Sequence, residues 1–173
     1  MPSRVASFAL RPASPDDAER ITRSYFAAWC ANLAYLFPDG VVAASDPLAR
    51  LPVFEAWLAA DSGFETTVAI DEGGAHLGHT TVRADELVHL FIDPGAQGRG
   101  VGHALLEHGE SQIAARGANR ARLFTLVGND AAVAFYRSHG WEETEGRQPG
   151  EYFGQPMVEQ LLVKSLQPAT MGP

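Results

Sequence analysis

The stretch LFIDPGAQGRGVGHALL, residues 90–106, decides the fold. Residues 90–92 are apolar and indicate a buried strand, which Asp93-Pro94-Gly95 ends. Gly98, Gly100 and Gly102 follow at alternate positions, where a helical pattern begins. Glycine adopts positive φ and lets a ligand approach the backbone closely, and the first amides of a helix have no partner within it. Together with the helix dipole, this strand-to-helix junction predicts a site for an anion.

Arg99 adds a cation to the same loop, so a phosphate group is the favoured anion. Two common phosphate-binding motifs are excluded. The dinucleotide motif fails because Leu105 stands where a third small residue belongs, and the Walker motif fails because no Lys-Ser or Lys-Thr follows Gly100. The glycine spacing alone leaves an ordinary strand-to-helix turn as the alternative.

The pattern on either side of this loop predicts a succession of strands and helices. The predicted strands are residues 5–11, 65–71, 76–83, 86–92, 120–127 and 157–165. The predicted helices are residues 14–33, 46–60, 100–116 and 131–138, and Ser14 and Pro15 suit the start of the first. A turn at Glu72-Gly73-Gly74 joins two strands into an antiparallel pair. We therefore expect a mixed α/β (α+β) sheet rather than a wholly parallel one.

The composition is that of a globular protein. The 173 residues fit one domain, residues 1–173, with 46% hydrophobic and 20% charged residues. The formal net charge of −8 disfavours nucleic acid as a partner, and no apolar run is long enough to span a membrane. We expect a cytoplasmic protein because the N-terminus lacks a signal-peptide core. Cys30 is the single cysteine, and its apolar surroundings predict a buried structural thiol.

Two segments resemble the signatures of the GNAT superfamily of acetyl-CoA-dependent N-acetyltransferases. The first is the glycine loop, in which Gln97-Gly98-Arg99-Gly100-Val101-Gly102 is similar to the acetyl-CoA signature of the family. The second matches the family pattern at Asn129, Ala134, Phe135, Tyr136, Gly140 and Trp141. The two segments have the order and spacing of the family, and the resemblance extends over roughly residues 64–145. It implies a mixed, mostly antiparallel central sheet of about six to seven strands flanked by about four helices.

The resemblance also implies how acetyl-CoA is held as the cosubstrate. The amides of the glycine loop would hold its pyrophosphate, and the backbone of the central strand would pair with its pantetheine arm. An amide at Leu90 or Phe91 would stabilise the oxyanion that forms during transfer. Asn129 would bond the cofactor or cap the helix that follows it. The implied cofactor residues are Leu90, Phe91, Ile92, Gln97, Gly98, Arg99, Gly100, Val101, Gly102, His103, Asn129 and Tyr136.

Tyr136 and Glu86 are the predicted catalytic residues. Tyr136 would be the general acid that protonates the leaving thiolate, with packing in its helix as the alternative role. Glu86 would be the general base, and an exposed strand-end carboxylate is the alternative. It lies an even number of residues before Leu90, which predicts that both side chains share one face of the strand, whereas His89 would point to the other. His79 is a further candidate base.

The predicted activity is direct transfer of an acetyl group from acetyl-CoA to a primary amine in a ternary complex. The acceptor would be a small molecule or a peptide amine, and a protein N-terminus or lysine is kept as an alternative. A non-catalytic acyl-CoA-binding or regulatory module on the same fold is the alternative from another class. We expect the acceptor pocket to be built by residues of roughly 25–60 and by a loop near residues 148–155. A homodimer is implied by family analogy alone.

Two pairs of histidines lie close together in the sequence, His76 with His79 and His103 with His108. A metal site needs several ligands, and no cysteine or carboxylate constellation accompanies either pair. We therefore predict scattered surface histidines and no metal site.

Overall fold

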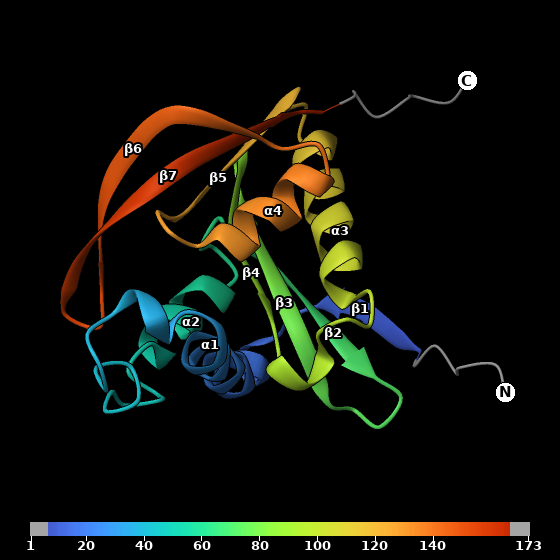
Figure 1. Ribbon diagram of the computed structural model, residues 1–173. Helices are drawn as coiled ribbons and strands as arrows, with labels where there is room; N and C mark the ends of the chain where they lie inside the picture. The colour runs from blue at the N-terminus through green and yellow to red at the C-terminus, as the bar shows by residue number, and fades with distance from the viewer. Residues whose placement is uncertain (1–6, 167–173) are drawn as a thin grey trace, which may run out of the picture.

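The described part of the chain folds into one seven-stranded sheet that carries helices on its faces (Figure 1). The computed structural model describes residues 7–166. Its strands are β1 (Phe8–Pro12), β2 (Glu65–Asp71), β3 (His76–Arg83), β4 (Glu86–Ile92), β5 (Arg120–Leu126), β6 (Glu142–Tyr152) and β7 (Gln155–Ser165). The α-helices are α1 (Ala18–Asn32), α2 (Leu51–Leu58), α3 (Val101–Ala115) and α4 (Asp130–Ser138). The predicted mixed fold is confirmed.

The sheet is antiparallel at every junction except one. Its strand order is β1-β2-β3-β4-β5-β7-β6, and the exception is the parallel pair β4 and β5. These two strands pair only where they begin, at Glu86 and Arg122. Beyond that point they separate, so the backbone of β4 that follows has no paired strand on its β5 side. The centre of the sheet is therefore open toward the carboxyl ends of β4 and β5.

Helices α1 and α3 pack on opposite faces of the sheet, each through one apolar stripe. The buried residues of α1 include Ile21, Tyr25, Ala28 and Trp29, and those of α3 are Val101, Leu105, Leu106, Gly109 and Ile113. The α1 stripe forms one cluster with Phe54 of α2 and Val68 of β2. Gly109 allows close packing of α3, since a Cβ there would lie 3.1 Å from Leu87 Cδ1.

One extra residue interrupts the pairing of β3 with β4. Thr81 pairs with His89 and Val82 pairs with Leu87, so Val88 is left over as a β-bulge. A bulge changes which side chains share a face, because the alternation of a strand has a period of two residues. The sequence pattern of β4 did not reveal this insertion, and its consequence for Glu86 is described below.

Strand β6 was not predicted from the sequence, and the expected loop near residues 148–155 is wrong. Residues 142–152 form a strand that pairs with β7, and the two are joined at Phe153-Gly154, both with positive φ as in a tight hairpin turn. β6 is the last strand of the sheet and is rich in charged residues and glycine. Such a sequence lacks the apolar alternation that identifies a half-buried strand.

The hairpin of β6 and β7 curves away from the other strands, and its turn lies beside the segment between α1 and α2 (Figure 1). Phe153 at the turn packs edge-on against Trp29 and Phe37, with ring centroids 5.3 and 5.5 Å apart. These aromatic contacts connect the hairpin turn to α1 and to the segment that follows it.

Three smaller expectations differ from the structure. The helix predicted at 46–60 is the shorter α2, and turns occupy most of residues 38–50. The first strand begins at Phe8 rather than residue 5: Ser7 is not part of it, and residues 5 and 6 of the prediction lie outside the described part of the chain. Cys30, predicted to be buried, is exposed because it lies on the outward side of α1.

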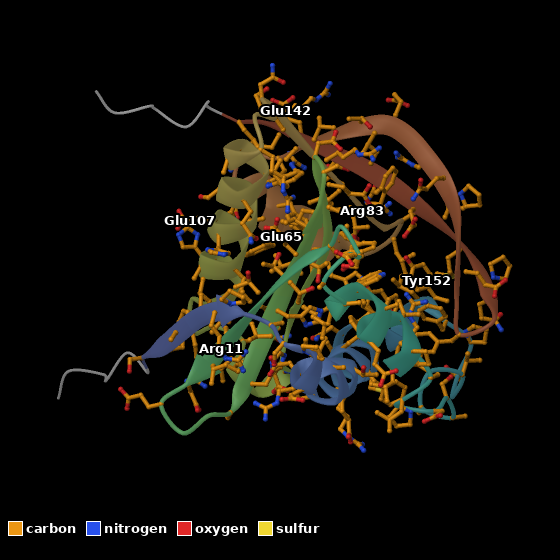
Figure 2. The ribbon with its side chains drawn as sticks, turned by 180° about the vertical axis from the view of Figure 1, so that it is seen from behind. Arg11, Glu65, Arg83, Glu107, Glu142 and Tyr152 are labelled. Atoms are coloured by element: carbon orange, nitrogen blue, oxygen red, sulfur yellow. The ribbon has the colours of Figure 1, made fainter. Side chains whose placement is uncertain are left out.

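The N-terminal strand is attached to the start of α1 by one ion pair. Arg11, labelled in Figure 2, projects from β1 and donates two hydrogen bonds to the carboxylate of Asp17, at 2.7 and 2.9 Å. Asp17 is buried and also accepts from the backbone amide of Ser14 at 2.8 Å. The guanidinium and the amide stabilise the carboxylate and hold its pKa well below the usual value, against the opposing effect of burial.

This pair makes a specific contribution to stability at low pH. Because the pKa of Asp17 is lowered on folding, its stabilisation is present above the unfolded pKa of about 4 and is lost as the pH falls below it. We expect Asp17→Asn to lower the free energy of unfolding by about 2 kcal/mol at pH 7, and to reduce its slope between pH 5 and 2. Urea titrations across this pH range measure both effects.

The matched control is Asp16→Asn, which removes an exposed carboxylate one residue away. It should leave the unfolding free energy within about 0.5 kcal/mol of the wild-type value. An equal loss in both variants would mean that general charge, and not the ion pair, sets the acid sensitivity.

Candidate active site

The glycine loop has the geometry of an anion site. After the one-turn helix Pro94–Ala96, Gly98 has φ +74° and Gly100 has φ +79° and precedes the first residue of α3. The first backbone hydrogen bond of α3 is donated by the Ala104 amide to the Gly100 carbonyl, at 3.1 Å. The amides of residues 101–103 therefore have no helical acceptor. These donors lie at the positive end of the helix dipole.

These glycines line a cleft of about 580 Å³ between α3, α4 and the open edge of β4, which we call the glycine-loop cleft. Its lining includes ten of the residues predicted for cofactor binding, namely Leu90, Phe91, Ile92, Gln97, Gly98, Gly100, Gly102, His103, Asn129 and Tyr136. The two others do not line it. The side chain of Val101 is buried beneath α3, and Arg99 is half-buried with no ion pair among residues 7–166.

Tyr136 and Asn129 reach the cleft from opposite ends of α4. Tyr136 is 8% exposed, and burial raises the pKa of its phenol, which therefore keeps its proton at neutral pH. Asn129 precedes α4, and its side-chain oxygen accepts from the amide of Ala132 at 3.3 Å. Its side-chain nitrogen donates to Thr125 Oγ1 at 3.2 Å. Asn129 thus acts as a helix cap and is also a wall of the cleft.

A second cavity of about 270 Å³, which we call the Glu86 pocket, lies beside the cleft. It is lined by Tyr25, Trp29, Leu33, Arg50, Trp57, Glu86, Val88, His89, Phe91, Phe124, Thr125, Leu126, Asn129, Gln148, Tyr152 and Glu159. Leu33, Phe91 and Asn129 line both cavities, so the two meet at these residues. A group held in one cavity is therefore next to a group held in the other.

Glu86 does not share a face with Leu90, contrary to the prediction from the strand alternation. The bulge at Val88 reverses the pattern, so Glu86, His89 and Phe91 all line the Glu86 pocket, whereas Leu90 packs toward α3. The Glu86 carboxylate is 27% exposed and lies 3.1 Å from the guanidinium of Arg122. Burial raises the pKa of this carboxyl, and the Arg122 charge opposes the rise.

The other candidate bases are disfavoured by burial. His89 stacks on Tyr25, with ring centroids 5.4 Å apart, and burial together with the Arg50 charge lowers its pKa to about 3. His79 is fully buried with neither ring nitrogen bonded, and it lines neither cavity. The interpretation of the histidines as surface residues is wrong for His79, which packs under α2. His103 is exposed, and its Nδ1 lies 2.9 Å from His139 Nε2.

Four polar residues of the Glu86 pocket were not identified individually from the sequence. Glu159 of β7 accepts from Tyr152 and, at 2.7 Å, from Gln148, both of β6. Figure 2 labels Tyr152 near the end of the β6–β7 hairpin. Arg50 enters from the residue before α2. Residues 25–60 and the segment near 148–155 were both expected to build the acceptor pocket, and they contain Arg50, Gln148 and Tyr152. No local pattern distinguishes Arg50 from a solvated arginine.

Within residues 7–166, no helix is both long and apolar enough to cross a membrane. The same residues contain no group of three or more histidine, cysteine or acidic side chains arranged to hold a metal ion.

Comparison with solved structures identifies the fold as that of N-acetyltransferases. A GCN5-related N-acetyltransferase from Rhodopseudomonas palustris superposes with a TM-score of 0.76 at 25% identity, over 91% of this chain and 95% of that one. The PaiA N-acetyltransferase of Thermoplasma acidophilum, solved in complex with coenzyme A, gives a TM-score of 0.70 at 17% identity, over 92% of this chain and 99% of that one.

The sequence comparisons identify the family. The profile of the acetyltransferase (GNAT) family matches residues 24–141, which is more than half of the chain, and the protein belongs to this family. The mycothiol acetyltransferase of Salinispora tropica is 34% identical over an alignment of 155 positions, which covers 82% of this chain and 46% of that protein. The chain therefore spans about half the length of this curated relative.

Proposed function

We propose that the chain transfers an acetyl group from acetyl-CoA to a primary amine by direct reaction in a ternary complex. The observation that carries the proposal is the meeting of two cavities at Phe91 and Asn129. One contains a built anion site and a protonated phenol, and the other contains a carboxylate of raised pKa. The cytoplasm, predicted from the sequence, is the proposed compartment.

The residues of the glycine-loop cleft fit acetyl-CoA as the donor. The free amides of residues 98–103 suit a pyrophosphate, and glycine at 98 and 100 leaves no side chain between backbone and ligand. The unpaired edge of β4 offers donors and acceptors to the amides of a pantetheine arm, as an edge strand does to an added strand. A donor held in this way extends from the loop toward Phe91, where the Glu86 pocket begins.

The proposed reaction uses Glu86 as the base on one side of the junction between the cavities and Tyr136 as the acid on the other. An ammonium acceptor of pKa about 10.4 must lose a proton first, which costs about 4 to 5 kcal/mol at pH 7. Glu86, directly or through water, accepts that proton. The free amine then attacks the thioester carbonyl, and a β4 amide at Leu90 or Phe91 stabilises the oxyanion. The carbon–sulfur bond breaks, and Tyr136 donates its proton to the leaving thiolate. The nitrogen loses its second proton as it becomes an amide, and that proton, passed through water, restores the Tyr136 phenol.

The first prediction concerns donor binding. Gly100 and Gly117 both have positive φ, and a Cβ at either would meet no protein atom within 4 Å, but only Gly100 lines the cleft. Isothermal titration of wild type with acetyl-CoA should give saturable binding at micromolar concentrations. Gly100→Val should weaken it about tenfold or more, since its side chain occupies the space that the ligand needs.

Gly117→Val is the matched control because it imposes a comparable backbone cost at the other end of α3. It should lose stability and keep wild-type affinity for acetyl-CoA. Wild-type protein that shows no heat of binding at tens of micromolar would remove the proposed donor altogether.

The second prediction concerns the acid. Tyr136→Phe keeps the ring that packs against Trp141 and removes only the hydroxyl. Turnover, followed by thiol release from acetyl-CoA, should fall by about 10²-fold, whereas the affinity for acetyl-CoA should remain nearly unchanged. Unchanged turnover would assign Tyr136 a packing role alone.

The third prediction concerns the base. Because the pKa of Glu86 is raised and the base must be ionised, activity should decline as the pH falls through that pKa. Glu86→Gln should lower kcat/KM by about 10²-fold and abolish the acidic limb that Glu86 produces. Asp85→Asn is the control, since Asp85 also pairs with Arg122, at 3.3 Å, but does not line the pocket. Equal losses in both variants would indicate that the Arg122 ion pairs matter only for structure.

A non-catalytic module on the same fold predicts a different result. It would bind acetyl-CoA and release no thiol with any member of a panel of primary amines. Small amines and lysine-containing peptides in the same panel separate the two acceptor classes.

A further inference from the structure

The Glu86 pocket contains one cation whose charge has no partner. The guanidinium of Arg50 makes no ion pair within residues 7–166, and its Nε is buried without a hydrogen bond. Arg50 as a whole is half-buried, so the cost falls on the buried Nε–H, a cationic donor that has lost water without gaining an acceptor. Such a group at the wall of a cavity indicates that a ligand supplies the missing acceptor.

The backbone of Arg50 is fixed, and the residue lines both the Glu86 pocket and a neighbouring cavity beside Tyr152 and Phe153. Its carbonyl accepts from the amides of Val53 and Phe54, at 3.1 and 3.2 Å, where α2 begins. Its guanidinium carbon lies 6.0 Å from the ring centroid of Tyr25, within range of a cation–π contact. The charge acts on groups across the cavity, since it opposes ionisation of His89 and favours that of Tyr152.

The carboxylates of the pocket are already engaged elsewhere. Glu86 pairs with Arg122, and Glu159 accepts from Tyr152 and Gln148. Neither lies within ion-pair distance of Arg50. The pocket therefore presents fixed negative charge at Glu86 and Glu159 and a separate, unneutralised positive charge at Arg50.

We propose that the acceptor is a small amino acid or similar amine that carries a carboxylate, and that Arg50 binds this carboxylate while the amine faces Glu86. The inference rests on the proposed function and names its acceptor class. A guanidinium matches a carboxylate with two parallel hydrogen bonds, which fixes the orientation as well as adding affinity. The aromatic walls at Trp57 and Phe124 suit an apolar substituent.

The size of the pocket favours a free small molecule over a protein chain. Its volume is about 270 Å³, near the lower end of small-molecule sites. The aromatic contacts of Phe153 hold the β6–β7 turn against α1, beside Tyr152 in the pocket wall. A free amino acid satisfies Arg50, whereas a lysine within a peptide brings no carboxylate near its amine.

The test compares amines that differ only in the carboxylate. Phenylalanine and phenethylamine form one pair, leucine and isoamylamine another, and ω-amino acids of increasing length vary the spacing of the two charges. Wild-type kcat/KM should favour the carboxylate member of at least one pair by roughly tenfold to hundredfold. Arg50→Gln should abolish that preference chiefly through KM, and Arg50→Lys should restore part of it.

The matched control is Arg120→Gln, which removes an exposed arginine outside the pocket and should leave the preference intact. Equal use of both members of every pair, or a preference that survives Arg50→Gln, would overturn the inference.

A binding experiment separates the inference from the proposed function. Calorimetry with the same acids and amines, in the presence of coenzyme A, reports recognition without turnover. Carboxylate-dependent binding that is lost in Arg50→Gln, with no thiol released, would retain the inference and remove the proposed catalysis. Thiol release with acceptors that lack a carboxylate, with no binding of the acids, would retain the proposed catalysis and reject the inference. Failure of every acid to bind in the wild type would reject Arg50 as a carboxylate site.

Discussion

The separation of β4 from β5 is the constraint on which the rest of the site depends. Within a sheet, each strand satisfies the backbone donors and acceptors of its neighbours, and an unpaired edge in the interior is unfavourable unless something else pairs with it. Here the two strands meet at Glu86 and Arg122 and then diverge. The gap gives the glycine-loop cleft one wall of free backbone, and it lets that cleft reach the Glu86 pocket.

The charges are distributed in accordance with this geometry. Donors without acceptors gather at the start of α3, where a polyanion would lie, and the carboxylates are found across the junction in the Glu86 pocket. Burial raises the pKa of both Tyr136 and Glu86. The phenol therefore keeps its proton, and the pKa of the carboxyl moves toward neutral pH. In the proposed reaction, one group has to lose a proton and the other to accept one. The raised pKa makes Glu86 a stronger proton acceptor. For Tyr136, burial ensures that the proton is present at neutral pH but makes its donation more costly, so the transfer needs the thiolate to be held close to the phenol.

The sequence predicted the local parts of the site and not those that depend on distant segments. The glycine loop, the strand before it and the Tyr136 helix are each encoded within about 20 residues, by turn chemistry and apolar periodicity. The face of Glu86 was predicted wrongly because the single extra residue at Val88 changes the alternation, and nothing in its neighbours marks a bulge. β6 was missed because its stability comes from pairing with β7 rather than from its own apolar pattern. Arg50 is distinguished only by the lack of an ion-pair partner among the described residues, which no local pattern encodes.

The two cavities are assembled from different lengths of the chain. The end of α1 contributes to both cavities. The glycine-loop cleft is otherwise built from residues 90–103 and 129–136, whereas the Glu86 pocket also needs Arg50, α2 and the distant β6–β7 hairpin. Few residues belong to both. Substitutions at Arg50 or along the inward side of the hairpin can therefore redraw one cavity while the other retains its shape. Because the two cavities depend on different segments, the proposed acceptor site can change in sequence while the proposed donor site stays the same.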